Sequence, residues 1–301
     1  MKHIFIVNPV AGVRNRTEEI IEKVKKVLKE DEYIIHQTTD ENDAARYVRN
    51  YLEENKEEQV RFYACGGDGT LNNVVNGAVG YKNAEVTCYP MGSGNDFLRY
   101  FGDLNDFISL ENLVNGDIIN CDVIKYNDKY CINIFNIGFD GAVVVSQRKI
   151  KKFPLISGQF AYFLGVVANV FKRLNYKVKL TVDGKMIYEG KSALCAMANG
   201  KCYGGGFYCA PSADINDGLI DICLIKKVSI FQFASFLGDY KKGTYITNPK
   251  ARKYFEVCQG KHVELEIEKP LYYANDGETG KDDKVVLDIV NNAIKFVIPK
   301  K

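Results

Sequence analysis

One loop of the sequence combines glycines with an acid in a pattern suited to phosphate chemistry. It spans residues 66–70 (GGDGT), between a hydrophobic run at 60–65 and a helix predicted to begin at about Leu71. Glycines allow the backbone to approach a polyphosphate closely, and the N-terminus of the following helix offers N–H groups and a positive dipole end to an anion. The pattern therefore predicts a phosphate site where a strand ends.

The acid in this loop, Asp68, predicts a cation. A carboxylate beside a triphosphate is repelled unless a cation lies between them, so Asp68 implies Mg²⁺, bound directly or through water. The loop has no Gly-Lys-Ser/Thr of a P-loop, and it lacks the third glycine of a dinucleotide fingerprint. The structural alternative is a tight turn in which Asp68 only caps the helix.

Two further strand ends carry similar residues. Residues 89–97 (YPMGSGNDF) place glycines, Ser93 and Asp96 after the next strand, and residues 8–12 (NPVAG) end the first strand. Asp96 is also a suitable helix cap, and Asn-Pro with a nearby glycine is common in ordinary turns. The three loops together favour a ligand site, because ligands of open α/β sheets bind beyond the carboxyl ends of the strands.

Alternating strands and helices must position these loops. Hydrophobic runs at 4–7, 33–36 and 60–65 alternate with helical patterns at 17–29 and 43–55. This alternation predicts a parallel, doubly wound, Rossmann-like α/β sheet over about the first 120 residues.

The rest of the chain has the pattern of a β-rich domain. From about Asp122 short strand-like runs follow one another, beginning with a hairpin across Asn127-Asp128, and helical patterns interrupt them at 158–173 and 229–240. The later predicted strands lie at 177–182, 263–267, 285–289 and 293–298. We therefore predict an α/β N-terminal domain at 1–122 and a mostly β C-terminal sandwich domain at 123–291, with a last strand at 292–301 that returns to the first domain.

The composition excludes several classes of protein. A net charge of +2 with 26% charged residues gives no field for capturing nucleic acid, so no nucleic-acid partner is expected. The nine cysteines stand singly, which favours reduced thiols in a cytoplasmic protein over disulfides or a metal site. The longest apolar stretch, at 160–171, is shorter than the roughly 20 residues that a membrane-spanning helix needs.

Together these loops resemble the diacylglycerol kinase catalytic-domain family, the bacterial soluble lipid kinases related to NAD kinases and sphingosine kinases. The segments that carry the resemblance are 8–12, 66–70, 92–97, 210–219 and 276–278. The first glycine loop is shared with NAD kinases, whereas the Gly-x-Gly-Asn-Asp-Phe loop is specific to the lipid kinases. The resemblance implies a fold of the NAD kinase and phosphofructokinase type. It also implies transfer of the γ-phosphate of ATP to the hydroxyl of a membrane lipid, with diacylglycerol, giving phosphatidic acid, as the leading case.

The resemblance also implies the ATP site. The residues that would contact ATP are Asn8, Pro9, Val10, Ala11, Gly12, Thr39, Gly66, Gly67, Asp68, Gly69, Thr70, Leu71, Asn72 and Ser93. The register is open at Thr39, because Thr38 precedes it and either threonine fits the family's pattern.

Metal and catalytic residues follow from the same resemblance. A structural Mg²⁺ would be held by Asp214, Asp217 and Leu219, although the residues alone read as a hairpin turn. Glu278 would be the base that activates the lipid hydroxyl, although its segment taken alone reads as a polar surface loop. Our hypothesis for the catalytic Mg²⁺ on ATP is that Asp68 and Asp96, with Asp122, organise it.

A lipid substrate requires contact with a membrane. The basic run at 148–152, followed by the amphipathic segment at 158–173, is suited to rest on the inner face of the membrane. A core helix beside a solvated basic turn is the alternative. A homodimer is one of the oligomeric states left open. The rival functions are an NAD kinase-like or other small-molecule kinase, and a sensor that binds nucleotide or lipid without turnover.

Overall fold

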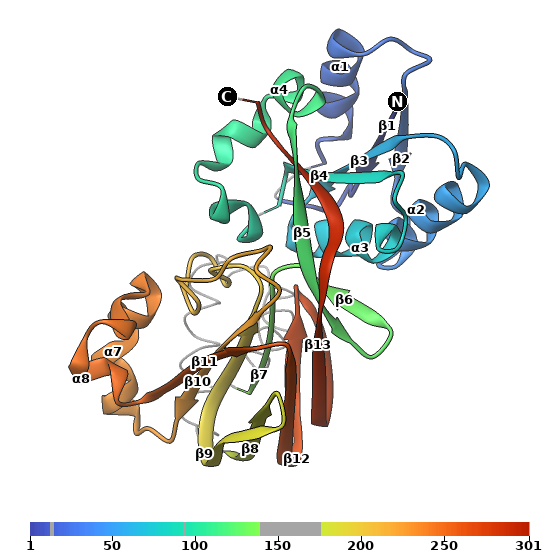
Figure 1. Ribbon diagram of the computed structural model, residues 1–301. Coiled ribbons are helices and arrows are strands. Elements are labelled where there is room, and N and C mark those ends of the chain that lie inside the picture. The colour runs from blue at the N-terminus through green and yellow to red at the C-terminus, as the bar shows by residue number, and fades with distance from the viewer. Residues whose placement is uncertain (13–14, 93, 139–175, 301) are drawn as a thin grey trace. The chain divides into compact units, whose positions relative to one another are not determined.

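The computed structural model describes residues 1–12, 15–92, 94–138 and 176–300 (Figure 1). The chain divides into two compact units. Unit 1 comprises Met1–Val123, Ile215–Asp217 and Val290–Lys301, and unit 2 comprises Ile124–Asp214 and Gly218–Ile289. Ser93, the basic run at 148–152 and the predicted helix at 158–173 lie outside the described residues.

Unit 1 is built on a parallel sheet. Its strands are β1 (Lys2–Val7), β2 (Tyr33–Gln37), β3 (Val60–Gly66), β4 (Ala84–Pro90) and the end of β13 (Glu278–Ile298), in the order β2-β1-β3-β4-β13. Ile4 to Val7 are fully buried, as expected for a central parallel strand covered on both faces. The predicted doubly wound α/β class is confirmed.

Helices connect these strands. They are α1 (Thr17–Val27), α2 (Asp43–Glu54), α3 (Asp68–Ala78), α4 (Leu110–Val114) and the 3₁₀ turns η1 (Phe97–Tyr100) and η2 (Leu104–Ile108). The prediction that α3 begins at about Leu71 was wrong, because the helix begins at Asp68, after Gly67 in extended conformation. An acid in the first turn is stabilised by the positive end of the helix dipole. Asp68 is therefore part of the helix N-terminus rather than of a loop before it.

Unit 2 is mostly antiparallel sheet. Its strands are β6 (Lys129–Cys131), β7 (Ile134–Gly138), β8 (Tyr176–Val182), β9 (Lys185–Ala198), β10 (Ile220–Lys226), β11 (Phe255–Gly260), β12 (His262–Asn275) and most of β13, joined by the end of β5 (Asp117–Tyr126). β7 and β8 both pair with β9 and with β12, at different parts of these long strands. One apolar cluster includes Phe135, Leu180 and Leu265 from these strands. The predicted β-rich second domain is confirmed.

A second apolar cluster of unit 2 attaches its helices. α7 (Ile230–Lys242), η3 (Thr244–Ile246) and α8 (Pro249–Arg252) lie beside β10 and β11 (Figure 1). Ser229 and Gln232 form a capping box at the start of α7, and Gly243 ends it in left-handed conformation at φ 75°. In the described ranges, no helix is both long enough and apolar enough to cross a membrane.

The buried His3 predicts a pH dependence of stability. Its Nδ1 lies 2.8 Å from the Tyr63 hydroxyl, and burial, aided by Arg61, lowers the pKa of His3 from 6.5 to about 4. As the pH falls below 6.5, the unfolded state takes up this proton before the folded state does. The stabilising contribution present above pH 6.5 is therefore lost progressively towards pH 4, by at most about 3 kcal/mol.

Urea unfolding at several pH values checks this expectation. The half-buried His262 has a pKa raised by its hydrogen bond to Asp288, so its contribution has the opposite sign. Comparing the wild type with His3→Gln isolates the buried histidine. The free energy of unfolding of the variant should change less between pH 6.5 and 4.5, and parallel curves for the two proteins would contradict the assignment.

Candidate functional site

Three loops of unit 1 meet at the carboxyl ends of β1, β3 and β4. The Asn8 N–H donates to the Cys65 carbonyl at 3.1 Å, which joins the first loop to the second. The N–H groups of Met91 and Gly92 donate to the Gly66 carbonyl at 2.8 and 2.9 Å, which joins the second loop to the third. The three segments singled out in the sequence therefore form one structure.

Glycines are required where these loops touch. A Cβ on Gly92 would lie 2.5 Å from the Gly67 Cα, so the two backbones pack directly against each other. Gly12 has φ +78°, and a Cβ there would lie 2.4 Å from the Met91 carbonyl oxygen. Only a residue without a side chain fits such contacts.

Asn8 links the first loop to α3. Its Nδ2 donates to Thr70 Oγ1 at 3.1 Å, and its Oδ1 accepts from the Val10 N–H at 3.1 Å. Pro9, Val10 and Ala11 complete the turn, in which the Ala11 N–H donates to the Asn8 carbonyl and Val10 is 84% exposed. The loop thus has a fixed base and an exposed tip.

Asp68 connects the first turn of α3 to the third loop. Its Oδ2 accepts from the Asp96 N–H at 3.1 Å, and its Oδ1 accepts from the Phe97 N–H at 3.3 Å. The side chain of Asp96 is buried and pairs with Arg99 Nε at 3.2 Å. The structure therefore brings together the two acids that the sequence singled out, through a side chain to backbone contact.

The remaining residues of the first glycine loop form the start of α3. The N–H groups of Thr70 and Leu71 both donate to the Gly67 carbonyl, at 3.0 and 3.1 Å. Leu71 and Asn72 are each 1% exposed, whereas Gly69 before them is half-buried. Leu71 and Asn72 therefore anchor the helix that carries the loop.

Asn95 is a residue of this site that the sequence reasoning missed. It has φ +64° and is buried, and its Nδ2 donates to the Gly92 carbonyl at 3.0 Å, while its Oδ1 has no hydrogen-bond partner among the described residues. Asparagine tolerates the left-handed region better than most residues. Its position between a glycine and Asp96 was the available signal.

Thr39 lies in a cluster of its own beyond β2. Its N–H and hydroxyl both donate to Asp43 Oδ2, at 2.9 and 3.2 Å, and Asp43 also contacts His36 and Arg46. Burial alone would raise the pKa of Asp43, but hydrogen bonds from Thr39 and His36 outweigh it and lower the pKa. Thr38 instead donates its N–H to the Val7 carbonyl at 2.9 Å, next to the first loop.

In unit 2, Glu278 is the first residue of β13 after a tight turn. Asp276 and Gly277 form this turn with φ of 44° and 93°. Lys129 Nζ contacts Glu278 Oε2 at 2.6 Å, and this hydrogen bond raises the pKa of Lys129. The Glu278 side chain is 30% exposed, so the carboxylate is held by an ion pair and remains open to solvent.

Asp276 fixes the base of this turn. Its carboxylate accepts from the N–H groups of Ile132, Asn133 and Ile134 at 2.7, 3.0 and 2.9 Å. Burial raises the pKa of Asp276 more than these hydrogen bonds lower it. Neither Asp276 nor Lys129 was given such a role from the sequence, where Asp-Gly indicates only a turn.

The residues predicted to bind metal ions lie at separate positions in the structure. Asp214 and Asp217 are exposed in a turn with Gly218 at φ +73°, and Asp217 belongs to unit 1 whereas Asp214 and Leu219 belong to unit 2. Asp122 is fully buried, and its Oδ1 accepts from the Asn292 N–H at 2.6 Å. Across the part of the chain that the structure describes, no three His, Cys, Asp or Glu side chains gather to hold a metal ion.

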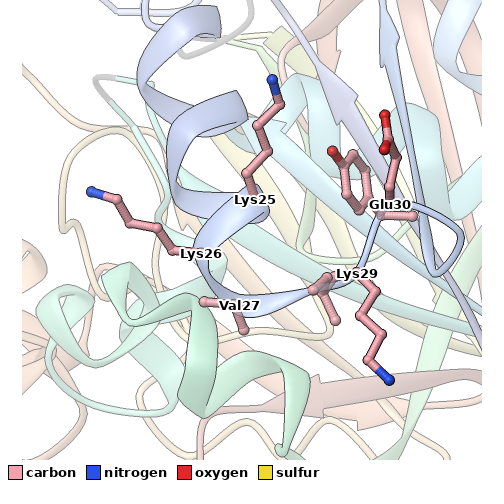
Figure 2. A pocket seen from close by; sticks show the side chains of 7 residues that line it. Lys25, Lys26, Val27, Lys29 and Glu30 are labelled. Atoms are coloured by element: carbon pink, nitrogen blue, oxygen red, sulfur yellow. The ribbon is translucent and has the colours of Figure 1, made fainter.

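A hollow at the end of α1 is separate from these loops (Figure 2). It is lined by Lys25, Lys26, Val27, Leu28, Lys29, Glu30 and Tyr33. None of these residues is among the predicted site residues. Lys25 and Lys26 point away from each other in the last turn of the helix.

Unit 1 has glycine loops at the carboxyl edge of a parallel sheet, which is where open α/β sheets bind ligands, and unit 2 is β-rich with an acid at a hairpin. Residues 2–126 match the diacylglycerol kinase catalytic domain, and residues 134–298 match the YegS C-terminal NAD kinase beta sandwich-like domain. The chain therefore belongs to the family of YegS-like lipid kinases and diacylglycerol kinases, and the resemblance seen in the sequence is confirmed.

Individual proteins that the chain resembles are also named as kinases of this family. The chain is 30% identical to a "Probable lipid kinase YegS-like" of Shewanella frigidimarina, over 85% of this chain and 81% of the relative. It is 26% identical to a diacylglycerol kinase of Bacillus subtilis, over 92% and 89% of the two chains. A crystal structure of a putative diacylglycerol kinase from Bacillus anthracis superposes with a TM-score of 0.74 at 22% identity, covering 99% of this chain and 97% of that one. An NAD kinase from Archaeoglobus fulgidus in complex with ATP shares the fold at a TM-score of 0.52 and 12% identity, covering 99% and 93%.

Proposed function

We propose that this protein is an ATP-dependent lipid kinase that transfers the γ-phosphate of ATP to the hydroxyl of diacylglycerol, giving phosphatidic acid. The observation that carries the proposal is the packing of three glycine loops at the carboxyl ends of β1, β3 and β4, with Asp68 hydrogen-bonded to the third loop, in a chain of the lipid kinase family. In this proposal unit 1 is the nucleotide-binding domain and unit 2 is the lipid-substrate domain. The protein works in the cytoplasm at the inner face of the membrane, without a nucleic-acid partner.

ATP would bind on the three loops of unit 1. Direct backbone contact between Gly67 and Gly92 leaves no side chain in the way of a polyphosphate, and the first turn of α3 offers it a positive dipole end. The exposed tip at Val10 and the Thr39 segment would flank the nucleotide. Of the residues assigned to ATP, Leu71 and Asn72 act by holding α3 in place.

Asp68 and Asp96 fit a hard cation. Both carry carboxylate oxygens, the kind of ligand that Mg²⁺ prefers, and the Asp96 backbone N–H donates to Asp68 Oδ2 at 3.1 Å. When bound to ATP, Mg²⁺ neutralises charge on the phosphates. Asp122 is fully buried and accepts the Asn292 N–H, and in this proposal we assign it to the structure of unit 1.

A structural Mg²⁺ would be held by Asp214, Asp217 and the Leu219 carbonyl. The two carboxylates are exposed, so they are accessible to a hydrated cation.

We expect Mg²⁺ to raise the melting temperature of the wild type, because a cation bound only by the folded state stabilises it, and to raise it less for Asp217→Asn. Thermal melts with and without Mg²⁺ test this, with Asp128→Asn, in another exposed turn, as the control. An equal rise of the melting temperature with Mg²⁺ in the wild type, Asp217→Asn and Asp128→Asn would contradict this Mg²⁺ site.

Glu278 would be the base of the reaction. The lipid hydroxyl transfers its proton to the Glu278 carboxylate while its oxygen forms the new bond to the γ-phosphorus, and ADP leaves. Lys129, at 2.6 Å, orients the carboxylate, and Asp276 holds the turn that carries it. These residues do not coordinate ATP in this proposal.

Transfer of labelled phosphate from ATP with Mg²⁺ tests the function. The acceptors are micellar diacylglycerol, other hydroxyl-bearing lipids, NAD and a control without acceptor. Labelled phosphatidic acid is the expected product, and label in another lipid would change the acceptor but keep the class. Label in NADP would favour the NAD kinase-like alternative, for which the shared fold is the supporting observation. ATP binding without any transfer would favour a sensor.

Replacing Gly66 by Ala should weaken ATP binding by about tenfold or more. A Cβ at this position would lie 2.2 Å from Thr70 Oγ1, so Thr70 and its hydrogen bond from Asn8 must shift. A displacement of about 1 Å in a loop that positions ATP misaligns its contacts and reduces the affinity. Titration calorimetry with ATP measures the effect. Gly238→Ala is the matched control, since a Cβ there meets no atom within 4 Å in the part of the chain that the structure describes. Unchanged binding in Gly66→Ala would place ATP elsewhere.

A further inference from the structure

The outward face of α7 is unlike that of an ordinary surface helix. Phe233, Phe236 and Tyr240 bury the inner face in the second apolar cluster of unit 2. The exposed residues of the opposite face, at helical spacing, are Phe231, Ala234, Ser235, Gly238, Lys241 and Lys242. Phe231 is 85% exposed, more than any other large hydrophobic side chain in the described ranges. The face therefore carries a large aromatic ring at one end, small residues in the middle and two cations at the other end.

Packing among the described residues does not account for two residues of this face. A Cβ on Gly238 would meet none of the described residues within 4 Å, yet glycine in a helix interior costs about 1 kcal/mol relative to alanine. The Phe231 ring at the helix start is 85% exposed, so it likewise gains little from the described residues around it. Both features instead suit a surface from outside the chain that approaches the helix closely and receives the ring.

Positive charge predominates in this region. Lys241 and Lys242 lie in the last turn of α7, and exposed Lys227 and Lys250 lie near its two ends in the sequence. The acid of the helix, Asp239, accepts hydrogen bonds from the Thr244 hydroxyl at 2.8 Å and Asn248 Nδ2 at 3.0 Å, so it is engaged within the helical region. A ring flanked by lysines complements an anionic lipid surface, with the ring at the headgroup boundary and the cations at the phosphates.

We propose that the outward face of α7 docks unit 2 on an anionic membrane surface, with Phe231 inserted and Lys241 and Lys242 contacting lipid phosphates. The inference rests on the proposed function in so far as a lipid acceptor requires the enzyme to reach a membrane. The outward face of α7 is the surface, among the described residues, that we assign to this contact.

Vesicle co-sedimentation tests the proposal with the full chain. The wild type should bind vesicles of phosphatidylcholine with phosphatidylglycerol and not vesicles of phosphatidylcholine alone, and salt should weaken binding. Each lysine near an anionic surface contributes a factor of about five, so Lys241→Glu with Lys242→Glu should reduce the partition coefficient at least tenfold. Phe231→Ser should reduce it as well.

Matched controls are available in the chain. Lys25→Glu with Lys26→Glu makes the same charge change in the last turn of α1, on the basic hollow of Figure 2, and Met186→Ser removes another exposed apolar side chain. Both controls should bind vesicles like the wild type. Equal losses in the α1 and α7 variants would reduce the effect to net charge and overturn the proposal. Monomer–dimer exchange abolished by Phe231→Ser, without an effect on vesicles, would assign the face to a second copy of the chain.

An activity measurement separates this proposal from the proposed function. The α7 variants should phosphorylate a water-soluble short-chain diacylglycerol at the wild-type rate and lose activity only on vesicles. Vesicle binding without phosphorylation of any lipid would reject the lipid kinase function and keep the docking face. Phosphorylation of lipid in vesicles that is unaffected in the α7 variants would reject the docking face alone.

Discussion

Replacing Glu278 by Gln should reduce phosphoryl transfer by about 10² to 10⁴-fold while ATP binding stays within a few-fold of the wild type. The amide keeps the size of the side chain but cannot take the proton of the attacking hydroxyl. Steady-state transfer to diacylglycerol, with ATP affinity from calorimetry, measures both quantities. Glu278 lies in unit 2, whereas the loops proposed for ATP lie in unit 1, which is why the two effects should separate.

Two further variants make this result specific. Asp283→Asn makes the same kind of change at an exposed position of the same strand and should leave turnover unchanged. Lys129→Met removes the partner of Glu278 but keeps the base, so it should cost only a few-fold. A loss in Lys129→Met as large as that in Glu278→Gln would mean that the ion pair, not the base, is what the reaction needs. Full activity of Glu278→Gln would contradict the proposed role of Glu278 as the base.

Replacing Asp276 by Ala should lower the free energy of unfolding by about 3 to 5 kcal/mol. The carboxylate is 7% exposed and accepts three backbone N–H groups, which the variant would leave buried without acceptors. Each such orphaned group costs about 1 to 3 kcal/mol. Urea unfolding followed by circular dichroism measures the loss, and the turnover of the folded fraction shows whether Glu278 is still positioned.

The control for this variant is Asp128→Ala. Asp128 lies in the exposed turn between β5 and β6, so it compares a solvated turn acid with a buried one, and its loss should stay within about 0.5 kcal/mol. Asp276→Asn keeps one accepting oxygen and should fall between the two. A decrease in the free energy of unfolding below about 1 kcal/mol in Asp276→Ala would show that water replaces the carboxylate. The turn would then not depend on the Asp276 side chain.

The glycine loops and the strand and helix pattern were predictable from local sequence. Apolar spacing identified β1, β3 and α2 nearly to their ends, because periodicity reflects which face of an element is buried. Glycines at 12, 66 and 92 marked places where a side chain would collide, although the atoms they approach could not be named. The start of α3 was misplaced by three residues, since the same glycine and acid pattern fits both a loop and a first helical turn.

The sequence by itself therefore determined the α/β and β-rich organisation, the family and the candidate residues, because each of these depends on residue types within short windows. Tertiary structure alone decided how those residues are held. Asp68 binds backbone 28 and 29 residues away, Lys129 pairs with Glu278 across 149 residues, and Asp276 binds Ile132 across 144 residues. No local propensity encodes such partners, because they are brought together only when the strands adopt their register and the free energy of burial selects which polar groups must be paired.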